Sequence, residues 1–207
     1  LYYAQVRGLG TLKLNSTREY IEKYTEEFYL VDLYYRRTLE AYHELITKEN
    51  PIEQTLSDSK RQLDLEYAKI TNVLNLEWLT CVEEKGAWFT ETGLKRQEDF
   101  YKNESDTSVK QVVIVCDALR YEVAKELMQE LAKEKHIATI DAYQAMLPTE
   151  TKYCKPALLP HHSLELNSTD MMVDGTLLTT TEQRTAHLGK YREGAICTRY
   201  EDVMNGD

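Results

Sequence analysis

Apolar side chains recur at helical spacing through the first part of the chain. From Ser16 to about Lys48 the steps between them alternate between three and four residues, which places them on one face of a helix. Ser16 and Glu19 form a capping-box pattern at the start of this stretch. The pattern therefore predicts one long amphipathic helix. Its apolar face consists of Ile21, Tyr24, Phe28, Val31, Tyr35, Leu39, Tyr42 and Ile46.

A second helix is predicted after Asn50-Pro51, with Asn50 as its cap and Pro51 in its first turn. The short connection predicts an antiparallel pair. Many apolar positions of the pair are tyrosines, whose hydroxyls need partners when they are buried. We therefore expect the stripe to lie partly at a surface or against another domain. A stacking platform for single-stranded nucleic acid is the alternative. The second apolar face consists of Leu56, Leu63, Tyr67, Ile70, Leu74 and Trp78.

The apolar pattern changes near Gln111. Val112–Cys116 is a continuous run of mostly β-branched residues, which predicts a strand buried on both faces, as in a parallel sheet. A helical pattern follows from Tyr121, and residues 137–146 predict a second strand. Strand, helix and strand in this order predict an α/β fold. We expect a helical region over residues 1–107 and an α/β region over residues 108–207.

Polar side chains follow both predicted strands. Asp117 ends the first strand, and Thr149 and Thr151 follow the second. Ligand sites in open α/β sheets form at the carboxyl ends of strands, where an acid faces a crevice that a metal or a phosphate can enter. Asp117 as a helix N-cap is the alternative, and both threonines can equally be caps.

The C-terminal part carries weaker signals. Val173-Asp174-Gly175 predicts a turn, and Thr179 with Glu182 predicts the capped start of a helix that runs to about Leu188. Residues 195–197 suggest a short strand, and Glu201 to Met204 the start of another helix.

Composition narrows the possible functions. The formal net charge is −10, which argues against a broad nucleic-acid-binding surface. No apolar stretch approaches the ~20 residues that span a bilayer. The four cysteines are widely spaced without a C-x-x-C motif, so they indicate reduced thiols and a cytoplasmic protein.

Three short motifs in a fixed order resemble one family. They are Asp117-Ala118-Leu119-Arg120-Tyr121-Glu122, then Leu147-Pro148-Thr149-x-Thr151, then Ala157-Leu158-Leu159-Pro160-His161. Together they resemble the PglZ family of the alkaline phosphatase superfamily, which belongs to bacterial BREX phage-defence systems. The resemblance implies an alkaline-phosphatase-like sheet, here only in part. It also implies a divalent metal (Zn, Mn or Mg) bound by Asp117 and Thr151, with Thr151 as the nucleophile of a hydrolase.

Other polar residues have weaker assignments. Arg120 can contact a phosphoryl oxygen, or it can pair with Glu122 or Glu126 as a structural bridge. Lys155 and Pro156 stand where the family pattern has Met-Ala, and Lys155 can attract phosphate. Adjacent histidines in a loop rarely bind one ion, so His161 and His162 favour a role other than metal ligation. We interpret His187 as structural or exposed.

Two functions from different classes remain open. The first is a metal-dependent phosphohydrolase or phosphodiesterase that acts on a nucleotide or a nucleic acid. The second is an assembly module that binds other BREX proteins, the methyltransferase among them. The chain begins with Leu1 and lacks a convincing set of further metal ligands. We therefore expect a fragment of a longer protein, cut within its α/β domain, that is inactive alone and holds no stoichiometric metal.

Overall fold

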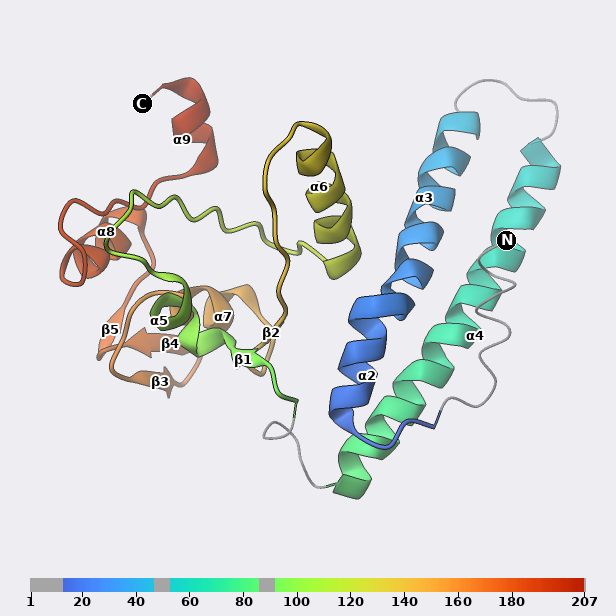
Figure 1. Ribbon diagram of the computed structural model, residues 1–207, viewed down its shortest axis with the longest axis horizontal. Coiled ribbons are helices and arrows are strands. Elements are labelled where there is room, and N and C mark those ends of the chain that lie inside the picture. Colours follow the sequence, from blue (N-terminus) through green and yellow to red (C-terminus); the bar gives the residue numbers. More distant parts are fainter. Residues whose placement is uncertain (1–12, 47–52, 86–91, 207) are drawn as a thin grey trace. The chain divides into compact units, whose positions relative to one another are not determined.

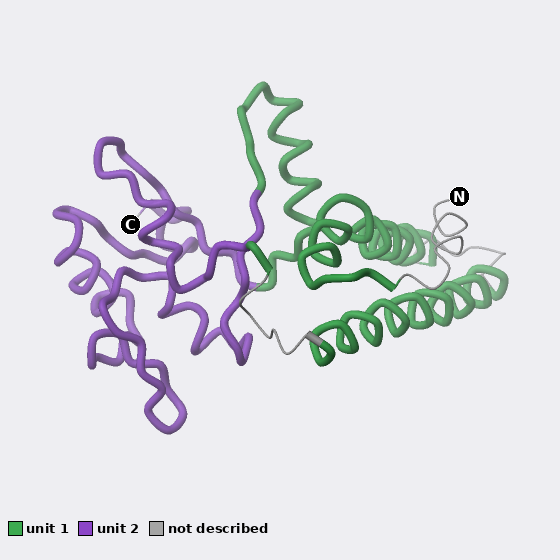
Figure 2. Tube along the Cα trace, turned by 60° about the horizontal axis from the view of Figure 1, so that its bottom comes forward, with its two compact units in different colours: residues 1–93, 118–140 green, residues 94–117, 141–207 purple. Residues whose placement is uncertain are grey.

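The computed structural model describes residues 13–46, 53–85 and 92–206 (Figure 1). Its contacts divide the chain into two compact units (Figure 2). Unit 1 comprises Leu1–Gly93 and Ala118–Ile140, and unit 2 comprises Leu94–Asp117 and Asp141–Asp207. Residues 118–140 therefore join the helices of the N-terminal half. The proposed domain boundary at residues 107 and 108 remains a prediction.

The long helix expected from Ser16 is present. It consists of α2 (Thr17–Lys23), a π-helical segment η1 (Tyr24–Phe28) and α3 (Tyr29–Ile46), which follow one another without a break. The Ser16 hydroxyl accepts a hydrogen bond from the Glu19 amide at 3.2 Å, as the capping pattern predicts. The Glu19 carboxylate accepts from the amide of Asn15, at 2.9 Å, one residue before the position that a capping box would give it.

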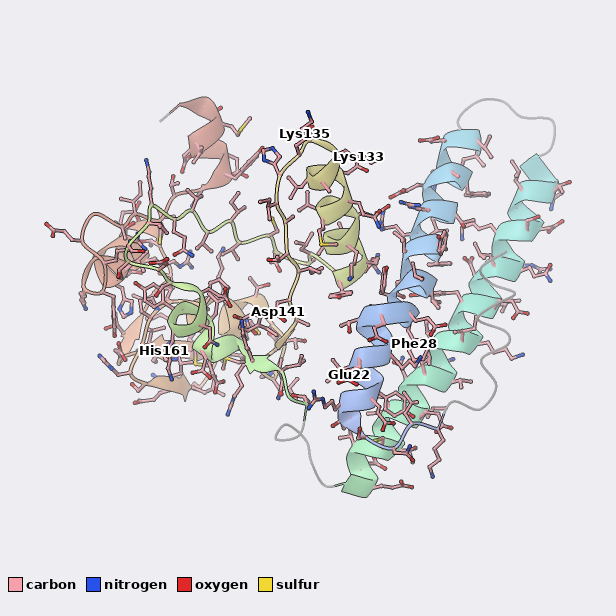
Figure 3. All side chains as sticks on the ribbon, viewed as in Figure 1. Glu22, Phe28, Lys133, Lys135, Asp141 and His161 are labelled. Carbon is pink, nitrogen blue, oxygen red and sulfur yellow. The ribbon has the colours of Figure 1, made fainter. Side chains whose placement is uncertain are left out.

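Helix α4 (Glu53–Lys85) runs antiparallel to α3, which confirms the predicted helix pair (Figure 1). The predicted cap Asn50 and Pro51 lie outside the described residues. The core of unit 1 contains side chains from both helices, Phe28 among them (Figure 3). Its buried apolar members are Tyr20, Phe28, Val31, Leu33, Cys81 and Val82.

The tyrosines of this pair have the partners that their hydroxyls require. Asp32 accepts hydrogen bonds from Tyr24 at 2.8 Å and from Tyr67 at 2.7 Å. The Tyr35 and Tyr67 rings stack with centroids 3.9 Å apart, and the Tyr35 hydroxyl donates to Asp64 at 2.9 Å. The pKa values of Tyr24 and Tyr67 are raised, mainly by burial and to a lesser extent by the nearby Asp32 carboxylate. The stripe thus serves packing between helices.

Helix α6 (Tyr121–Lys133) completes unit 1 and packs against α3. Its Glu122 side chain is fully buried, with 0% of its surface exposed. Arg120 Nη2 lies 2.7 Å from Glu122 Oε1, and Arg36 Nε of α3 lies 3.9 Å from the same atom. Glu126 forms ion pairs with Arg36 and Arg37. The two helices are therefore joined by a cluster of ion pairs.

Unit 2 contains a short parallel strand pair. β1 (Lys95–Arg96) pairs with β2 (Tyr143–Gln144), with Lys95 opposite Tyr143. Lys95 Nζ lies 3.0 Å from Glu104 Oε1 and 3.1 Å from Asp141 Oδ2. Between the two strands in sequence lie the 3-10 helix η2 (Gln97–Asp99) and helix α5 (Phe100–Glu104).

A three-stranded antiparallel sheet forms the rest of the β-structure of unit 2. It contains β3 (Leu164–Asn167), β4 (Asp170–Val173) and β5 (Thr176–Leu177) in that order. Asp174 and Gly175, with φ of 49° and 72°, form the predicted turn between β4 and β5. Two consecutive residues with positive φ suit a two-residue hairpin. Helix α7 (Thr151–Ala157) packs against β4, which contributes the buried Val173.

The C-terminal helices are α8 (Thr181–Gly189) and α9 (Tyr200–Asn205). α9 confirms the helix expected near Glu201. The cap of α8 is shifted by one residue from the prediction, because Thr180 rather than Thr179 accepts from the Gln183 amide, at 3.3 Å. Gln183 rather than Glu182 closes the capping box, with its side-chain oxygen 3.1 Å from the Thr180 amide.

The prediction of a central strand at Val112–Cys116 is wrong in this structure. These residues form no strand, and Val112 and Ile114 are 77% and 74% exposed. A strand is stabilised by hydrogen bonds to a neighbouring strand, and none of the described strands pairs with this run. The strand expected over residues 137–146 is reduced to Tyr143–Gln144, and residues 195–197 form no strand. The structure therefore agrees with the predicted α/β fold only in part: it contains both helices and sheets, and its parallel sheet has two short strands.

Candidate functional site

Asp117 and Thr151 meet in unit 2. The Thr151 hydroxyl donates a hydrogen bond to Asp117 Oδ2 at 2.9 Å, and both side chains are exposed. Asp117 is followed by Ala118 in a left-handed conformation, with φ of 57°. Two residues that are 34 positions apart thus share a hydrogen bond at the surface.

Neither residue is a helix cap. Helix α6 is capped by Arg120, three residues after Asp117, and helix α7 is capped by Glu150. Thr151 is the first helical residue of α7, and Thr149 precedes the cap. The capping interpretations of Asp117, Thr149 and Thr151 are therefore wrong. Helix capping does not explain why Asp117 and Thr151 are in contact.

Gln97 of η2 holds the segment that carries Thr151. Its side-chain nitrogen donates to the Cys154 carbonyl at 3.1 Å, and its side-chain oxygen accepts from the Met146 amide at 3.1 Å. One side chain therefore ties the chain before and after Thr151 to the same point. Helix α7 is further fixed by its buried residues Tyr153, Pro156 and Ala157.

Two lysines and a cysteine lie near Thr151 on helix α7. Lys155 is exposed on α7, one helical turn after Thr151. Lys152 Nζ lies 3.4 Å from Glu150 Oε2 and 4.6 Å from the centre of the Tyr153 ring. Burial raises the pKa of the Cys154 thiol, so it stays protonated near neutral pH and is not an activated nucleophile.

Arg120 is committed to another partner. Its guanidinium pairs with Glu122 within unit 1, which confirms the structural bridge as one of the two interpretations of this residue. Glu126 pairs instead with Arg36 and Arg37. A phosphate-binding role for Arg120 remains a prediction.

The histidines have structural contacts. His161 Nδ1 lies 2.7 Å from the Leu159 carbonyl oxygen, and the His162 amide donates to Asp174 Oδ1 at 2.7 Å (Figure 3). His187 is buried, with Nε2 at 2.7 Å from the Pro160 carbonyl oxygen, which agrees with the structural interpretation.

Asp174 of unit 2 accepts hydrogen bonds from three groups. It accepts from the amides of His162 and Ser163, at 2.7 and 2.8 Å, and from the Tyr191 hydroxyl at 2.8 Å. Burial alone would raise the pKa of Asp174, but these donors outweigh it and lower that pKa to about 2. Asp174 therefore organises the turn around it.

Asp117 and Thr151 fit a divalent cation only in part. Both offer oxygen atoms, which Mg²⁺, Mn²⁺ and Zn²⁺ accept as ligands. Within residues 13–46, 53–85 and 92–206, no three His, Cys, Asp or Glu side chains converge closely enough to hold a metal ion. No helix among the described residues has the length and apolar character of a membrane span.

Comparison with known proteins defines the class of the chain. The sequence model of the BREX system PglZ alkaline phosphatase-like domain matches residues 98–206, which is more than half of the chain and includes Asp117 and Thr151. The chain is thus an alkaline phosphatase-like protein. It belongs to the PglZ family.

Two relatives support this assignment. The alkaline phosphatase-like protein PglZ of Bacillus cereus (strain H3081.97) is 29% identical over 188 residues, which cover 87% of this chain and 21% of that protein. The alkaline phosphatase-like protein BrxZ of Escherichia coli O9:H4 (strain HS) is 33% identical over 114 residues, or 50% of this chain and 13% of that protein. The chain thus spans about a fifth or less of the length of these relatives. No solved structure matches it.

Proposed function

We propose that Asp117 and Thr151 belong to the reacting centre of a metal-dependent phosphohydrolase or phosphodiesterase, formed in a longer protein. The observation that carries the proposal is the 2.9 Å hydrogen bond between Thr151 Oγ1 and Asp117 Oδ2. Two exposed residues from separate motifs meet there without serving as caps. Membership in an alkaline phosphatase-like family supports the same assignment.

Each residue has a distinct role in this proposal. Thr151 is the nucleophile, and Asp117 orients its hydroxyl and supplies a carboxylate ligand. A threonine hydroxyl is a weak nucleophile near neutral pH, so it needs activation. A bound divalent cation would lower the pKa of that hydroxyl and polarise a phosphoryl oxygen. Lys155, exposed one turn along α7, would attract the phosphate by its charge.

The test of this function uses the full-length protein that contains the chain. Thr151→Ala should lower hydrolysis of bis(p-nitrophenyl) phosphate by at least about 10³-fold, because the attacking oxygen is lost. Thr149→Ala is the matched control and should retain activity, since Thr149 is exposed and precedes the cap of α7. Equal loss in both variants, or full activity of Thr151→Ala, would refute the role of Thr151.

The 207-residue chain itself should neither bind metal stoichiometrically nor catalyse hydrolysis. Two oxygen ligands, one of them a neutral hydroxyl, are fewer than the three protein ligands that catalytic metal sites normally have. Elemental analysis of the purified chain after exposure to Zn²⁺, Mn²⁺ or Mg²⁺ measures the first point, and the phosphodiester assay measures the second. Metal-dependent turnover that Thr151→Ala abolishes would show that local groups complete the site.

A second candidate function is assembly with other proteins of a phage-defence system. The name of the matching domain places its family in BREX systems, and the exposed apolar run Val112–Val115 is available for contacts. Other BREX proteins, the methyltransferase among them, are the proposed partners. If assembly is the main function, Thr151→Ala should leave both complex formation and phage resistance intact. If hydrolysis is the main function, that variant should assemble but lose resistance.

A further inference from the structure

Helix α4 has apolar side chains on two opposite faces. Helix α4 lies beside α2 and α3 (Figure 1). On the face that contacts these helices, the Trp78 and Tyr20 ring centroids are 5.9 Å apart and Tyr67 stacks on Tyr35. On the other face Leu65 and Leu76 are 66% and 64% exposed, and Leu79 is also exposed. No described helix or strand covers these leucines. A helix that is apolar on both sides is suited to packing between two partners.

The exposed face has a symmetric spacing. At about 100° per residue, its members fall within roughly 80° of one another. The steps between them are 4, 3, 4, 4, 3 and 4 residues, so the pattern is the same in both directions from its centre at Asn72. The members are Arg61, Leu65, Ala68, Asn72, Leu76, Leu79 and Glu83. We call this set the outer stripe of α4.

The symmetry makes the outer stripe complementary to itself. When a second α4 lies antiparallel with Asn72 opposite Asn72, Leu65 faces Leu79 and Ala68 faces Leu76. Leucine against leucine, and a small residue against a large one, gives the interdigitation that helix pairs require. A single asparagine at the centre of an apolar seam is a known determinant of register.

The charges at the two ends select the antiparallel arrangement. Arg61 and Glu83 are both exposed and terminate the outer stripe at opposite ends. In the antiparallel pair each Arg61 faces a Glu83 of the other copy. In a parallel pair, arginine would face arginine and glutamate would face glutamate, which is unfavourable.

We propose that the outer stripe of α4 is a dimer interface, and that its occupant is a second copy of this chain in antiparallel orientation. The seam from Arg61 to Glu83 is about 33 Å long at 1.5 Å per residue. The carrying observations are the exposed leucines, the symmetric spacing and the opposite charges at the two ends. The proposal is independent of the hydrolytic function.

Charge reversal tests the pairing directly in the full-length protein. Arg61→Glu and Glu83→Arg should each raise the dimer dissociation constant by about tenfold, because two ion pairs become two repulsions. The double variant restores opposite charges across the seam and should return the constant to within about threefold of the original. Analytical ultracentrifugation measures each constant. A double variant as weak as the single ones, or a protein that is monomeric throughout, would overturn the proposal.

Disulfide trapping tests the register. Asn72→Cys, in a Cys116→Ser background that removes the exposed native thiol, should oxidise to a covalent dimer because the two positions face each other. Asn75→Cys is the matched control. Its counterpart in the pair is residue 69, so two cysteines at 75 lie about 9 Å apart along the axis, beyond disulfide reach.

Two results would overturn the proposed register and occupant. Equal cross-linking at positions 72 and 75 would indicate random collision rather than a defined interface. A monomeric Asn72→Cys protein whose introduced thiol is protected from thiol reagents would show that another part of the polypeptide, or a different protein, covers the outer stripe.

Discussion

Two carboxylates five positions apart in the sequence have opposite surroundings. Glu122, in the ion-pair cluster of unit 1, is completely buried, and the arginines beside it, Arg120 and Arg36, carry charge of opposite sign. Asp117, in unit 2, is exposed, and its partner is the neutral hydroxyl of Thr151. The charge of Glu122 is neutralised within the protein, whereas the charge of Asp117 remains available to a ligand. Burial and the charge of the neighbours therefore distinguish a structural acid from a candidate catalytic one.

The largest expected effect is a loss of activity when the negative charge of Asp117 is removed. In the full-length protein, Asp117→Asn should lower phosphodiesterase activity by about 10³-fold and weaken divalent metal binding by at least about tenfold. Its melting temperature should stay unchanged because the side chain is exposed. Glu150→Gln, an exposed acid near Thr151, is the control and should keep its activity. A folded Asp117→Asn protein with normal turnover would contradict the assignment of Asp117 as the catalytic acid and Glu122 as the structural one.

The next effect is one of stability and belongs to the buried acid. Arg36→Met leaves Glu122 buried with only one arginine and should destabilise the protein by about 3 kcal/mol. Arg37→Met is the matched control, because Arg37 pairs with Glu126 rather than with Glu122, and its cost should stay below about 1 kcal/mol. Urea denaturation measures both. Replacing Arg36 and Glu122 together by Met should recover most of the loss, since no buried charge remains.

A third acid lies between these extremes and responds to pH. The pKa of Asp174 is about 2 in the folded protein, below its ordinary value, so its carboxylate stabilises the fold near neutral pH. That contribution is fully present above about pH 5 and is lost as the pH falls toward 2. Asp174→Asn should therefore destabilise the protein by roughly 1–2 kcal/mol at about pH 7 and by much less near pH 2. Asparagine tolerates the positive φ of this position, so the comparison isolates the charge. A pH-independent difference between the two proteins would argue against the carboxylate as the cause.

The smallest expected effect distinguishes two neighbouring threonines. Thr180→Ala removes the hydroxyl that accepts from the Gln183 amide and should cost about 1 kcal/mol. Thr179→Ala should cost less, because the Thr179 hydroxyl contacts the Gln183 side chain and not a free helix amide. Thermal unfolding of both variants is sufficient. A larger cost for Thr179→Ala would assign the cap to the residue that the sequence pattern first suggested.

Helices were predictable here because their signal is local. The three-and-four spacing from Ile21 to Ile46 depends only on neighbours along the chain, and it predicted the continuous helix well. The run Val112–Cys116 carries an equally clear apolar signal, yet it forms no strand. Strand formation depends on a partner elsewhere in the chain, which apolar composition alone does not identify.

The residues of the candidate site could be predicted from the sequence only in part. The strand-end pattern suggested Asp117, and the resemblance to the family selected Thr151 over Thr149. The role of Gln97 had no signal, because its two hydrogen bonds reach residues 49 and 57 positions away. The commitment of Arg120 to Glu122 was one of two alternatives that spacing could not separate.

The π-helical segment Tyr24–Phe28 means that the first long helix contains more residues per turn there than an α-helix would. The widened turn carries the Thr25 carbonyl, which accepts a hydrogen bond from the Tyr121 hydroxyl of α6 at 3.3 Å. A helix can accommodate one inserted residue as a widened turn of this kind without breaking. A lineage that loses the residue keeps its helix but turns every later side chain by about 100° relative to α6. Alignments of relatives should therefore place a single-residue gap at this segment together with changes at Arg36 and Tyr121, two of the residues through which the helices meet.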